Sequence, residues 1–300
     1  MAETTKRVAL ITGAARGQGR AVAERLARDG MNIVICDICE NLEGVDYPLG
    51  SLGELMETRE IVQQNGAECL ARPADVRFQQ QLDALVSDAV DRFGSLDVGV
   101  ANAGIMGYGR LWEMPDEMWQ QMIDINLTGV WRTIKAVAPQ MISQNSGSIV
   151  LTASAVGKVG ATMYGHYAAA KHGLLGLAKS AALELAPYNI RVNSILPAVI
   201  DTVMNDNAFA RDIIAGHPNA TREEFLEATR HCFILQDRRA LPPEAAAAAI
   251  AWLVGDEARH LTGVELPVDA GNLLLRGFNP SPARAPEAAS TQQISGLVAE

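Results

Sequence analysis

The sequence predicts one α/β domain, built on a doubly wound parallel sheet of about seven strands with helices on both faces. Three observations support this prediction. Short apolar runs alternate with helical segments along much of the 300-residue chain. Several of these runs lack polar alternation, as expected for strands that crossover helices bury on both faces. A glycine-rich segment separates the first run from the first helix, which is typical of sheets of this class.

The expected elements follow in order from the amino terminus. The first strand covers residues 8–11, and the first helix covers residues 20–28. The next helix starts from a capping box formed by Ser51 and Glu54. A long helix is expected from about Asp116. The remaining elements are a helix at 78–93 and strands at 32–36, 68–72, 97–101 and 148–152.

The loop after the first strand predicts a phosphate cradle. It reads Thr12-Gly13-Ala14-Ala15-Arg16-Gly17-Gln18-Gly19. Glycine tolerates a positive φ and lets backbone amides approach a pyrophosphate at the positive end of a helix. A glycine-rich match alone is a weak signal, because glycines also occur in ordinary turns. Its position between a strand and a helix makes it typical of dinucleotide-binding Rossmann folds.

Asp37 favours NAD over NADP. It lies at the carboxyl end of the second strand, where an acidic residue binds the ribose hydroxyls of the adenosine. A carboxylate there would repel the 2′-phosphate of NADP. Arg16 is the opposing observation, since a guanidinium in the loop can neutralise a phosphate, although it can equally serve the pyrophosphate or solvent. We give more weight to Asp37.

Tyr167 and Lys171 are the expected acid-base pair. They stand four residues apart in a predicted helix, so they share one face. An ammonium group beside a phenol stabilises the phenolate and would pull the tyrosine pKa from about 10 toward neutrality. Such a pair is also common on solvated helices, but here two further polar residues support a catalytic role. Ser154 follows a strand at the edge where these sheets bind ligands, and Asn126 interrupts a predicted helix.

Taken together, these motifs resemble the short-chain dehydrogenase/reductase family, from about Lys6 to Gly271. The further matches, in chain order, are Asp75-Val76, Asn102-Ala103-Gly104, Arg191-Val192-Asn193, Pro197 and Thr202. Two positions depart from the family pattern without removing a catalytic group. Ala101 stands where asparagine is frequent, and Ala198 replaces the glycine that usually follows the proline.

The resemblance implies roles for individual residues. Ser154 would polarise the substrate oxygen, and Tyr167 would transfer the proton. Lys171 would lower the pKa of that tyrosine and bind the nicotinamide ribose, while Asn126 would hold a water in a proton relay through Lys171. The residues implied to bind NAD are Gly13, Arg16, Gly17, Gln18, Gly19, Asp37, Asp75, Val76, Asn102, Ala103, Tyr167, Lys171, Ile200 and Thr202.

An insertion at residues 38–50 narrows the resemblance. An arbitrary insertion is most often a surface loop without consequence. This one contains Tyr47-Pro48-Leu49 and, with the Tyr167 motif, resembles carveol dehydrogenases, a mycofactocin-coupled subset of the family. In that subset the insertion is thought to cover the adenosine and to hold NAD without free exchange. A mycofactocin-type redox cofactor then regenerates it.

Composition excludes several other functions. A net charge of −10 offers no basic footprint for nucleic acid or an anionic membrane. No apolar run reaches the roughly 18 residues that span a bilayer, and the first strand begins too early for a cleaved signal, so a cytoplasmic protein is expected. We expect no metal site, because Cys36 and Cys39 have no second cysteine pair and are better explained by packing.

We expect residues 1–276 to form the domain and residues 277–300, rich in Pro, Ala and Ser, to form a flexible tail. The segment after Tyr167 is rich in Ala and Gly between leucines, and family resemblance makes it, with the long helix from Asp116, a subunit contact of a homotetramer.

An apolar substrate pocket is expected from three segments. Residues 201–241 would form a partly helical flap, with Met204, Phe209, Ile213, Ile214, Phe225 and Phe233. The other walls would come from Met106, Tyr108, Trp112, Met163 and Tyr164. Such a lining favours a neutral hydrophobic alcohol or ketone, such as a carveol-like terpenoid. Two alternatives stay open: an exchangeable NAD(P)(H)-dependent reductase of a ketone or 3-oxoacyl thioester, and a noncatalytic NAD-binding scaffold.

Overall fold

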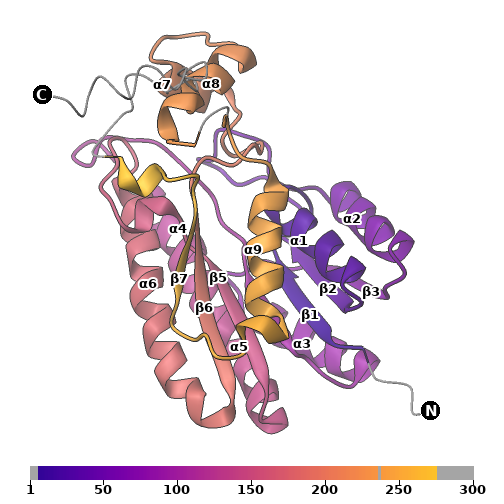
Figure 1. Ribbon diagram of the computed structural model, residues 1–300. Coiled ribbons are helices and arrows are strands. Elements are labelled where there is room, and N and C mark those ends of the chain that lie inside the picture. Colours follow the sequence, from indigo (N-terminus) through magenta and orange to yellow (C-terminus); the bar gives the residue numbers. More distant parts are fainter. Residues whose placement is uncertain (1–5, 236–237, 276–300) are drawn as a thin grey trace, which may run out of the picture.

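The computed structural model describes residues 6–235 and 238–275 of the chain. Seven strands form one parallel sheet in the order β3-β2-β1-β4-β5-β6-β7 (Figure 1). The prediction of a doubly wound α/β fold is therefore confirmed. The strands are β1 (Val8–Thr12), β2 (Asn32–Asp37), β3 (Cys69–Pro73), β4 (Val98–Ala101), β5 (Gly147–Thr152), β6 (Ile190–Pro197) and β7 (Glu265–Val268).

Helices cover both faces of the sheet, and each face has its own apolar core (Figure 1). The central strands are buried throughout, which explains why they read as continuous apolar runs. One face packs against α1 (Gly17–Arg28), α2 (Leu52–Gln64) and α9 (Pro243–Val254). The other packs against α3 (Gln79–Phe93), α5 (Gly129–Gln144) and α6 (Gly165–Leu185).

Local signals set several helix boundaries. The predicted capping box is present at the start of α2, where the Ser51 hydroxyl accepts a hydrogen bond from the Glu54 amide at 3.2 Å. The predicted long helix is divided in the structure. It begins as α4 (Asp116–Ile123), widens into a π-helical turn at Asp124–Thr128, and continues as α5. Asn126 lies in that turn, so the expected interruption is confirmed.

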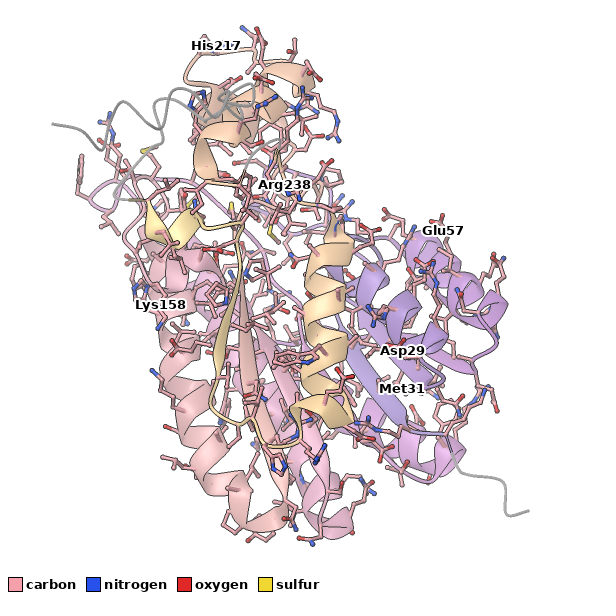
Figure 2. All side chains as sticks on the ribbon, viewed as in Figure 1. Asp29, Met31, Glu57, Lys158, His217 and Arg238 are labelled. Carbon is pink, nitrogen blue, oxygen red and sulfur yellow. The ribbon has the colours of Figure 1, made fainter. Side chains whose placement is uncertain are left out.

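Two short helices form a cap above the carboxyl ends of the strands (Figure 1). They are α7 (Ala208–Ala215) and α8 (Arg222–Thr229), and the loop between them carries His217 at the outer tip of the cap (Figure 2). Phe225 and Phe233 are fully buried, so they pack inside this part of the molecule. The predicted flap over residues 201–241 is therefore partly helical, as expected.

The flexible tail predicted at residues 277–300 lies outside the described residues. Within the described part of the chain, no helix combines the length and the apolar character needed to cross a membrane.

Candidate active site

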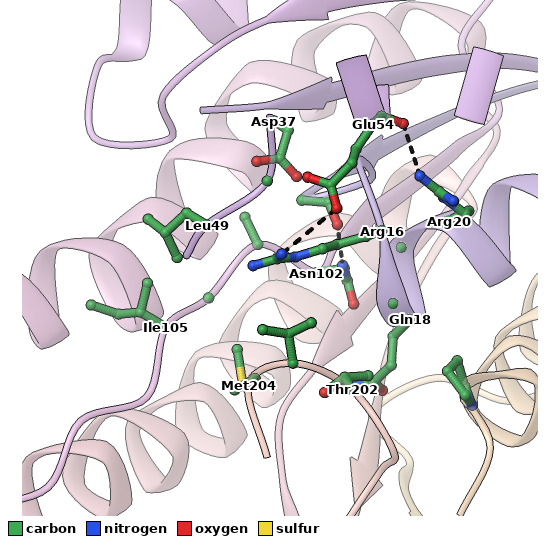
Figure 3. A pocket seen from close by; sticks show the side chains of 18 of the residues that line it. Arg16, Gln18, Arg20, Asp37, Leu49, Glu54, Asn102, Ile105, Thr202 and Met204 are labelled. Carbon is green, nitrogen blue, oxygen red and sulfur yellow. Dashed lines mark hydrogen bonds and ion pairs between the residues drawn. The ribbon is translucent and has the colours of Figure 1, made fainter. Parts of the chain in front are cut away.

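A cavity of about 590 Å³ lies at the carboxyl ends of β1, β2 and β4, where the strand order of the sheet reverses (Figure 3). Open α/β sheets bind ligands at this point, because the loops after neighbouring strands diverge there. The lining includes most of the residues predicted to bind a dinucleotide: Gly13, Arg16, Gly17, Gln18, Gly19, Asp37, Asp75, Val76, Asn102, Ala103 and Thr202.

The glycines of the first loop fit a phosphate cradle. Gly13 and Gly17 have φ angles of 67° and 57°, which strain any residue with a side chain. Gly19 has no room for one, since an added Cβ would collide with the Gly13 carbonyl oxygen and lie 2.8 Å from the Ala14 Cα. The loop leads directly into α1, and the first residues of that helix line the cavity. The free backbone amides of a helix N-terminus favour an anion there. The geometry therefore accommodates a pyrophosphate.

Asp37 is the last residue of β2 and lies beside this loop. Its Oδ2 accepts a hydrogen bond from the Ala15 amide at 3.0 Å. Burial raises the pKa of Asp37 above its usual range, although backbone hydrogen bonds, chiefly from Ala15, oppose the shift. Arg16 is already engaged: its guanidinium donates to the Pro48 carbonyl and lies 3.7 Å from Glu54 (Figure 3). These partners tie Arg16 to the insertion and to α2.

The insertion at residues 38–50 forms a wall of this cavity, through Ile38, Leu42, Tyr47, Leu49 and Gly50. Three hydrogen bonds fix it to distant parts of the fold. Besides the bond from Arg16 to Pro48, Gln121 on α4 donates to the Glu43 carbonyl at 3.1 Å, and the Met106 amide donates to the Tyr47 hydroxyl at 3.0 Å. The insertion is thus part of the site and not an unattached surface loop.

A second cavity of about 200 Å³ adjoins the first. Ser154, Tyr167 and Lys171 all line it. The two cavities share five lining residues, Gln18, Asn102, Gly104, Ile105 and Met204. A ligand in the second cavity would therefore meet a dinucleotide that occupies the first.

The candidate catalytic side chains lie together. Ser154 lies two residues after β5, and its hydroxyl donates to the Pro197 carbonyl at 3.4 Å in the same cavity as the Tyr167 phenol. One turn along α6, the Lys171 ammonium lies 5.5 Å from the centre of the Tyr167 ring and donates to the Thr152 carbonyl at 2.7 Å. Asn126 and Lys171 both approach Gly104: an added Cβ there would lie 3.1 Å from the asparagine Oδ1 and 3.9 Å from the lysine Nζ.

The sequence predicted a lowered pKa for Tyr167, and this prediction is wrong when only the groups of the protein act on it. Burial raises the pKa of Tyr167 above its usual value, and the nearby Ser154 hydroxyl opposes this only in part. Burial also lowers the pKa of Lys171 to about 7. Removal from water disfavours the charged form of both groups, and Lys171 points its amine at a backbone carbonyl. In the protein alone, burial therefore disfavours the Tyr167 phenolate.

The Lys171 shift predicts a pH-dependent stability. Because its folded pKa lies below the unfolded value, the unfolded chain binds more protons between about pH 7 and pH 10.5, so the cost of burial is complete below pH 7 and fades as the pH rises. We expect Lys171→Met to raise the Tm of nucleotide-free protein by about 2 °C or more near pH 6, and by less near pH 9. Thermal unfolding at both pH values measures this. A gain that grows with pH would contradict it.

The side chains of two predicted site residues do not point into either cavity as ligand-binding groups. The Asn126 side chain is hydrogen-bonded to the backbone of Ile105. Its Oδ1 accepts from the Ile105 amide at 2.8 Å, and its Nδ2 donates to the Ile105 carbonyl at 2.7 Å. Any part of Asn126 in a water relay thus falls to its main chain. The Ile200 side chain packs in a separate cluster with Phe233 and Leu241, outside the linings of both cavities.

The second cavity has an apolar lining, as predicted. The predicted residues that line it are Met106, Tyr108, Tyr164, Met204, Ile213 and Ile214. Phe209 reaches it indirectly, with its ring centre 5.0 Å from that of Tyr108. Trp112 is 78% exposed and Phe225 and Phe233 are buried elsewhere, so these three do not form the pocket.

Sequence reasoning missed several polar residues of the site, among them Thr12, Thr152, Asn205 and Asn272. The Thr12 hydroxyl accepts hydrogen bonds from the Asn102 and Ala103 amides at 3.0 and 3.1 Å. Thr152 supplies the carbonyl that holds Lys171, and Asn272 lines the second cavity. Both threonines could have been found from the sequence, because each is a polar residue at the carboxyl end of a buried strand. Asn272 lies in the segment after β7, and no motif in the sequence marked that segment as part of the site.

The cysteines are free thiols. Cys36 is fully buried in one apolar core and Cys39 is partly buried against the other, which agrees with packing rather than with a disulfide. Among residues 6–235 and 238–275, no cluster of three or more His, Cys, Asp or Glu side chains has the arrangement of a metal site.

Comparison with known proteins places this geometry among enzymes. A family model described as short chain dehydrogenase matches residues 7–212. The chain is 44% identical over 272 residues to an uncharacterized NAD-dependent oxidoreductase of Mycobacterium tuberculosis, spanning 89% of this chain and 96% of that one. It is 43% identical over 282 residues to (-)-trans-carveol dehydrogenase of Rhodococcus erythropolis, spanning 91% and 100%. The solved structure of carveol dehydrogenase from Mycobacterium avium in complex with NAD matches with a TM-score of 0.88 at 39% identity, covering 92% of this chain and all (100%) of that one.

Proposed function

The chain belongs to the short-chain dehydrogenase family, and on that premise we propose that it is an NAD-dependent alcohol dehydrogenase that interconverts a hydrophobic secondary alcohol and its ketone. One observation carries the proposal. Ser154 and Tyr167 line one small, mostly apolar cavity that shares five lining residues with a cavity fitted for a dinucleotide. Reaction between an alcohol and a nicotinamide requires such a boundary.

NAD supplies the hydride acceptor when it is bound. In alcohol oxidation Ser154 donates a hydrogen bond to the substrate oxygen, while the neighbouring Tyr167 phenolate accepts the hydroxyl proton. Lys171 shares the face of α6 with Tyr167 and, when protonated, favours the phenolate electrostatically. In ketone reduction the phenol returns the proton. Gly13, Gly17 and Gly19 hold the pyrophosphate, and the Asp37 carboxylate accepts hydrogen bonds from the adenosine ribose.

The apolar lining supports a carveol-like substrate. The walls are formed by methionine, isoleucine and tyrosine side chains, which suit an uncharged terpenoid or alicyclic ring. The (-)-trans-carveol dehydrogenase of Rhodococcus erythropolis is similar over 91% of this chain. An exchangeable NAD(P)(H)-dependent ketone or 3-oxoacyl reductase is the second candidate.

We further propose that NAD is held without free exchange and that a mycofactocin-type redox cofactor regenerates it. The support is the fixed insertion. Pro48 is bonded to Arg16, Tyr47 is bonded to Met106, and Gly50 lies directly against Asp37. These contacts hold the insertion in the cavity wall next to Asp37, where the adenosine ribose would bind.

Protein purified without added nucleotide tests both proposals. The released dinucleotide is identified after denaturation, and turnover of carveol is measured with free NAD and, separately, with an artificial electron acceptor. We expect one bound NAD per chain and turnover that depends on the acceptor. Empty protein that reduces free NAD would instead identify the exchangeable dehydrogenase, and binding of NAD without any turnover would identify a scaffold.

We also propose a homotetramer. Trp131 on α5 and Leu183 on α6 expose large apolar surface on the helices that were expected to form subunit contacts. Light scattering on the purified protein should give four times the 32.1 kDa chain mass. The mass of a single chain would contradict this assembly.

A further inference from the structure

Four residues form a continuous link between the two cavities. The link starts in the insertion, crosses the loop after β4 and ends on the cap helix α7. We call it the bridging chain, and its members are Tyr47, Met106, Tyr108 and Phe209.

The first contact of the bridging chain joins the insertion to the substrate wall. Tyr47 lines the dinucleotide cavity and is only 7% exposed. Its hydroxyl accepts a hydrogen bond from the Met106 amide at 3.0 Å. Burial raises the pKa of Tyr47 to about 12, so the phenol keeps its proton near neutral pH. Met106 itself lines the second cavity, so this bond joins the two linings.

The next contacts continue to the cap. The Tyr108 hydroxyl donates to the Met106 sulfur at 3.1 Å, so tyrosines hold Met106 at both its backbone and its side chain. The Tyr108 ring then packs against Phe209 at 5.0 Å between centres. Phe209 lies on α7 and is not among the residues that line the dinucleotide cavity.

We propose that the bridging chain couples the insertion at residues 38–50, which walls the dinucleotide cavity, to the cap helix α7 beside the substrate pocket. Loosening the cap at Phe209 then speeds the release of NAD. This rests on the proposed placement of NAD and substrate in the two cavities. Tyr47 is then a positioning residue for both ligands. By linkage, a substrate that packs against Met106 and Tyr108 tightens NAD binding by the same factor by which NAD tightens substrate binding.

A double-mutant cycle on NAD release tests the coupling. Protein loaded with NADH is mixed with excess NAD, and the loss of nicotinamide fluorescence is followed in Tyr47→Phe, Phe209→Leu and the double variant. Tyr47→Phe leaves the Met106 amide without its acceptor and should speed release by about tenfold. Phe209→Leu, which removes only the aromatic contact at the distant end, should speed it by about threefold.

The double variant decides between coupling and independence. Because both changes break one chain, it should release NADH about as fast as Tyr47→Phe alone, about tenfold over wild type and not the product of the two effects. Two matched variants control for general damage. Tyr188→Phe removes an exposed hydroxyl, and Phe93→Leu repeats the second change at the end of α3, at the amino edge of the sheet. Both should release NADH at the wild-type rate.

Unchanged release in Phe209→Leu, or a double variant equal to the product of the single effects, would overturn the coupling. The Tm of each variant shows that it is folded. Because the measurement uses no alcohol, its result stands whether or not the proposed substrate class is right, which turnover of the wild type tests separately.

Discussion

Tyr167→Phe is expected to lower kcat for alcohol oxidation by a factor on the order of 10³ while NAD remains bound. The change removes the only hydroxyl proposed to accept the substrate proton and keeps the ring that packs at the start of α6. The ring is buried and does not need the hydroxyl for its apolar contacts. Steady-state kinetics together with the NAD content of the purified variant measures the two effects separately.

Tyr188→Phe is the matched control for this change. Tyr188 is 41% exposed and follows α6 at its far end, so its substitution should leave kcat within the error of the wild type. If Tyr167→Phe retained wild-type kcat, the proposed proton transfer would be wrong. If it lost NAD as well as activity, the tyrosine would serve binding and not chemistry.

Gly50→Ala is expected to convert firmly held NAD into NAD that exchanges readily, with release faster by a factor on the order of 100. Gly50 is buried against Ala15 of the glycine-rich loop and Asp37 at the end of β2. A methyl group there would come within 2.7 Å of the Ala15 Cβ and 2.8 Å of the Asp37 Oδ1. Neither atom can retreat easily, because Ala15 and Asp37 hold each other by a hydrogen bond. The insertion must therefore shift outward from the adenosine side.

Gly53→Ala separates this effect from a general response to losing a glycine. Gly53 lies in the first turn of α2, three residues beyond Gly50, and the nearest atom to an added Cβ is 3.9 Å away. Alanine there should stabilise the helix by about 0.5 to 1 kcal/mol and leave NAD release unchanged. Release is measured as bound NAD remaining after incubation with excess labelled NAD. Equal release rates in Gly50→Ala and wild type would mean that the insertion does not retain the nucleotide.

Several features of the site could be predicted from the chain because they depend on local physics. A glycine loop between a buried strand and a helix has one productive conformation, and the structure places Gly13, Gly17 and Gly19 in it. The four-residue spacing of Tyr167 and Lys171 fixes them on one face of any helix. Ser154 was predictable for a similar reason, since the carboxyl ends of parallel strands meet at one edge of the sheet.

Other features depend on contacts between distant segments, for which the sequence carried no signal. The spacing of Tyr167 and Lys171 predicted an ammonium beside a phenol, and the structure places it there. Lys171 also donates to the Thr152 carbonyl, however, and burial moves both pKa values against the charged forms. Burial depends on every element that packs around α6, and no local pattern encodes it.

The sequence by itself determined the fold class, the phosphate loop and the identity of the candidate catalytic groups. Tertiary structure alone decided what those groups touch. Arg16 is engaged by Pro48 of the insertion, and Tyr47 reaches the Met106 amide, a residue 59 positions away in the chain. The physical reason is one of range. Backbone conformation and helical spacing act over a few residues, whereas hydrogen bonds and desolvation depend on atoms that only folding brings together.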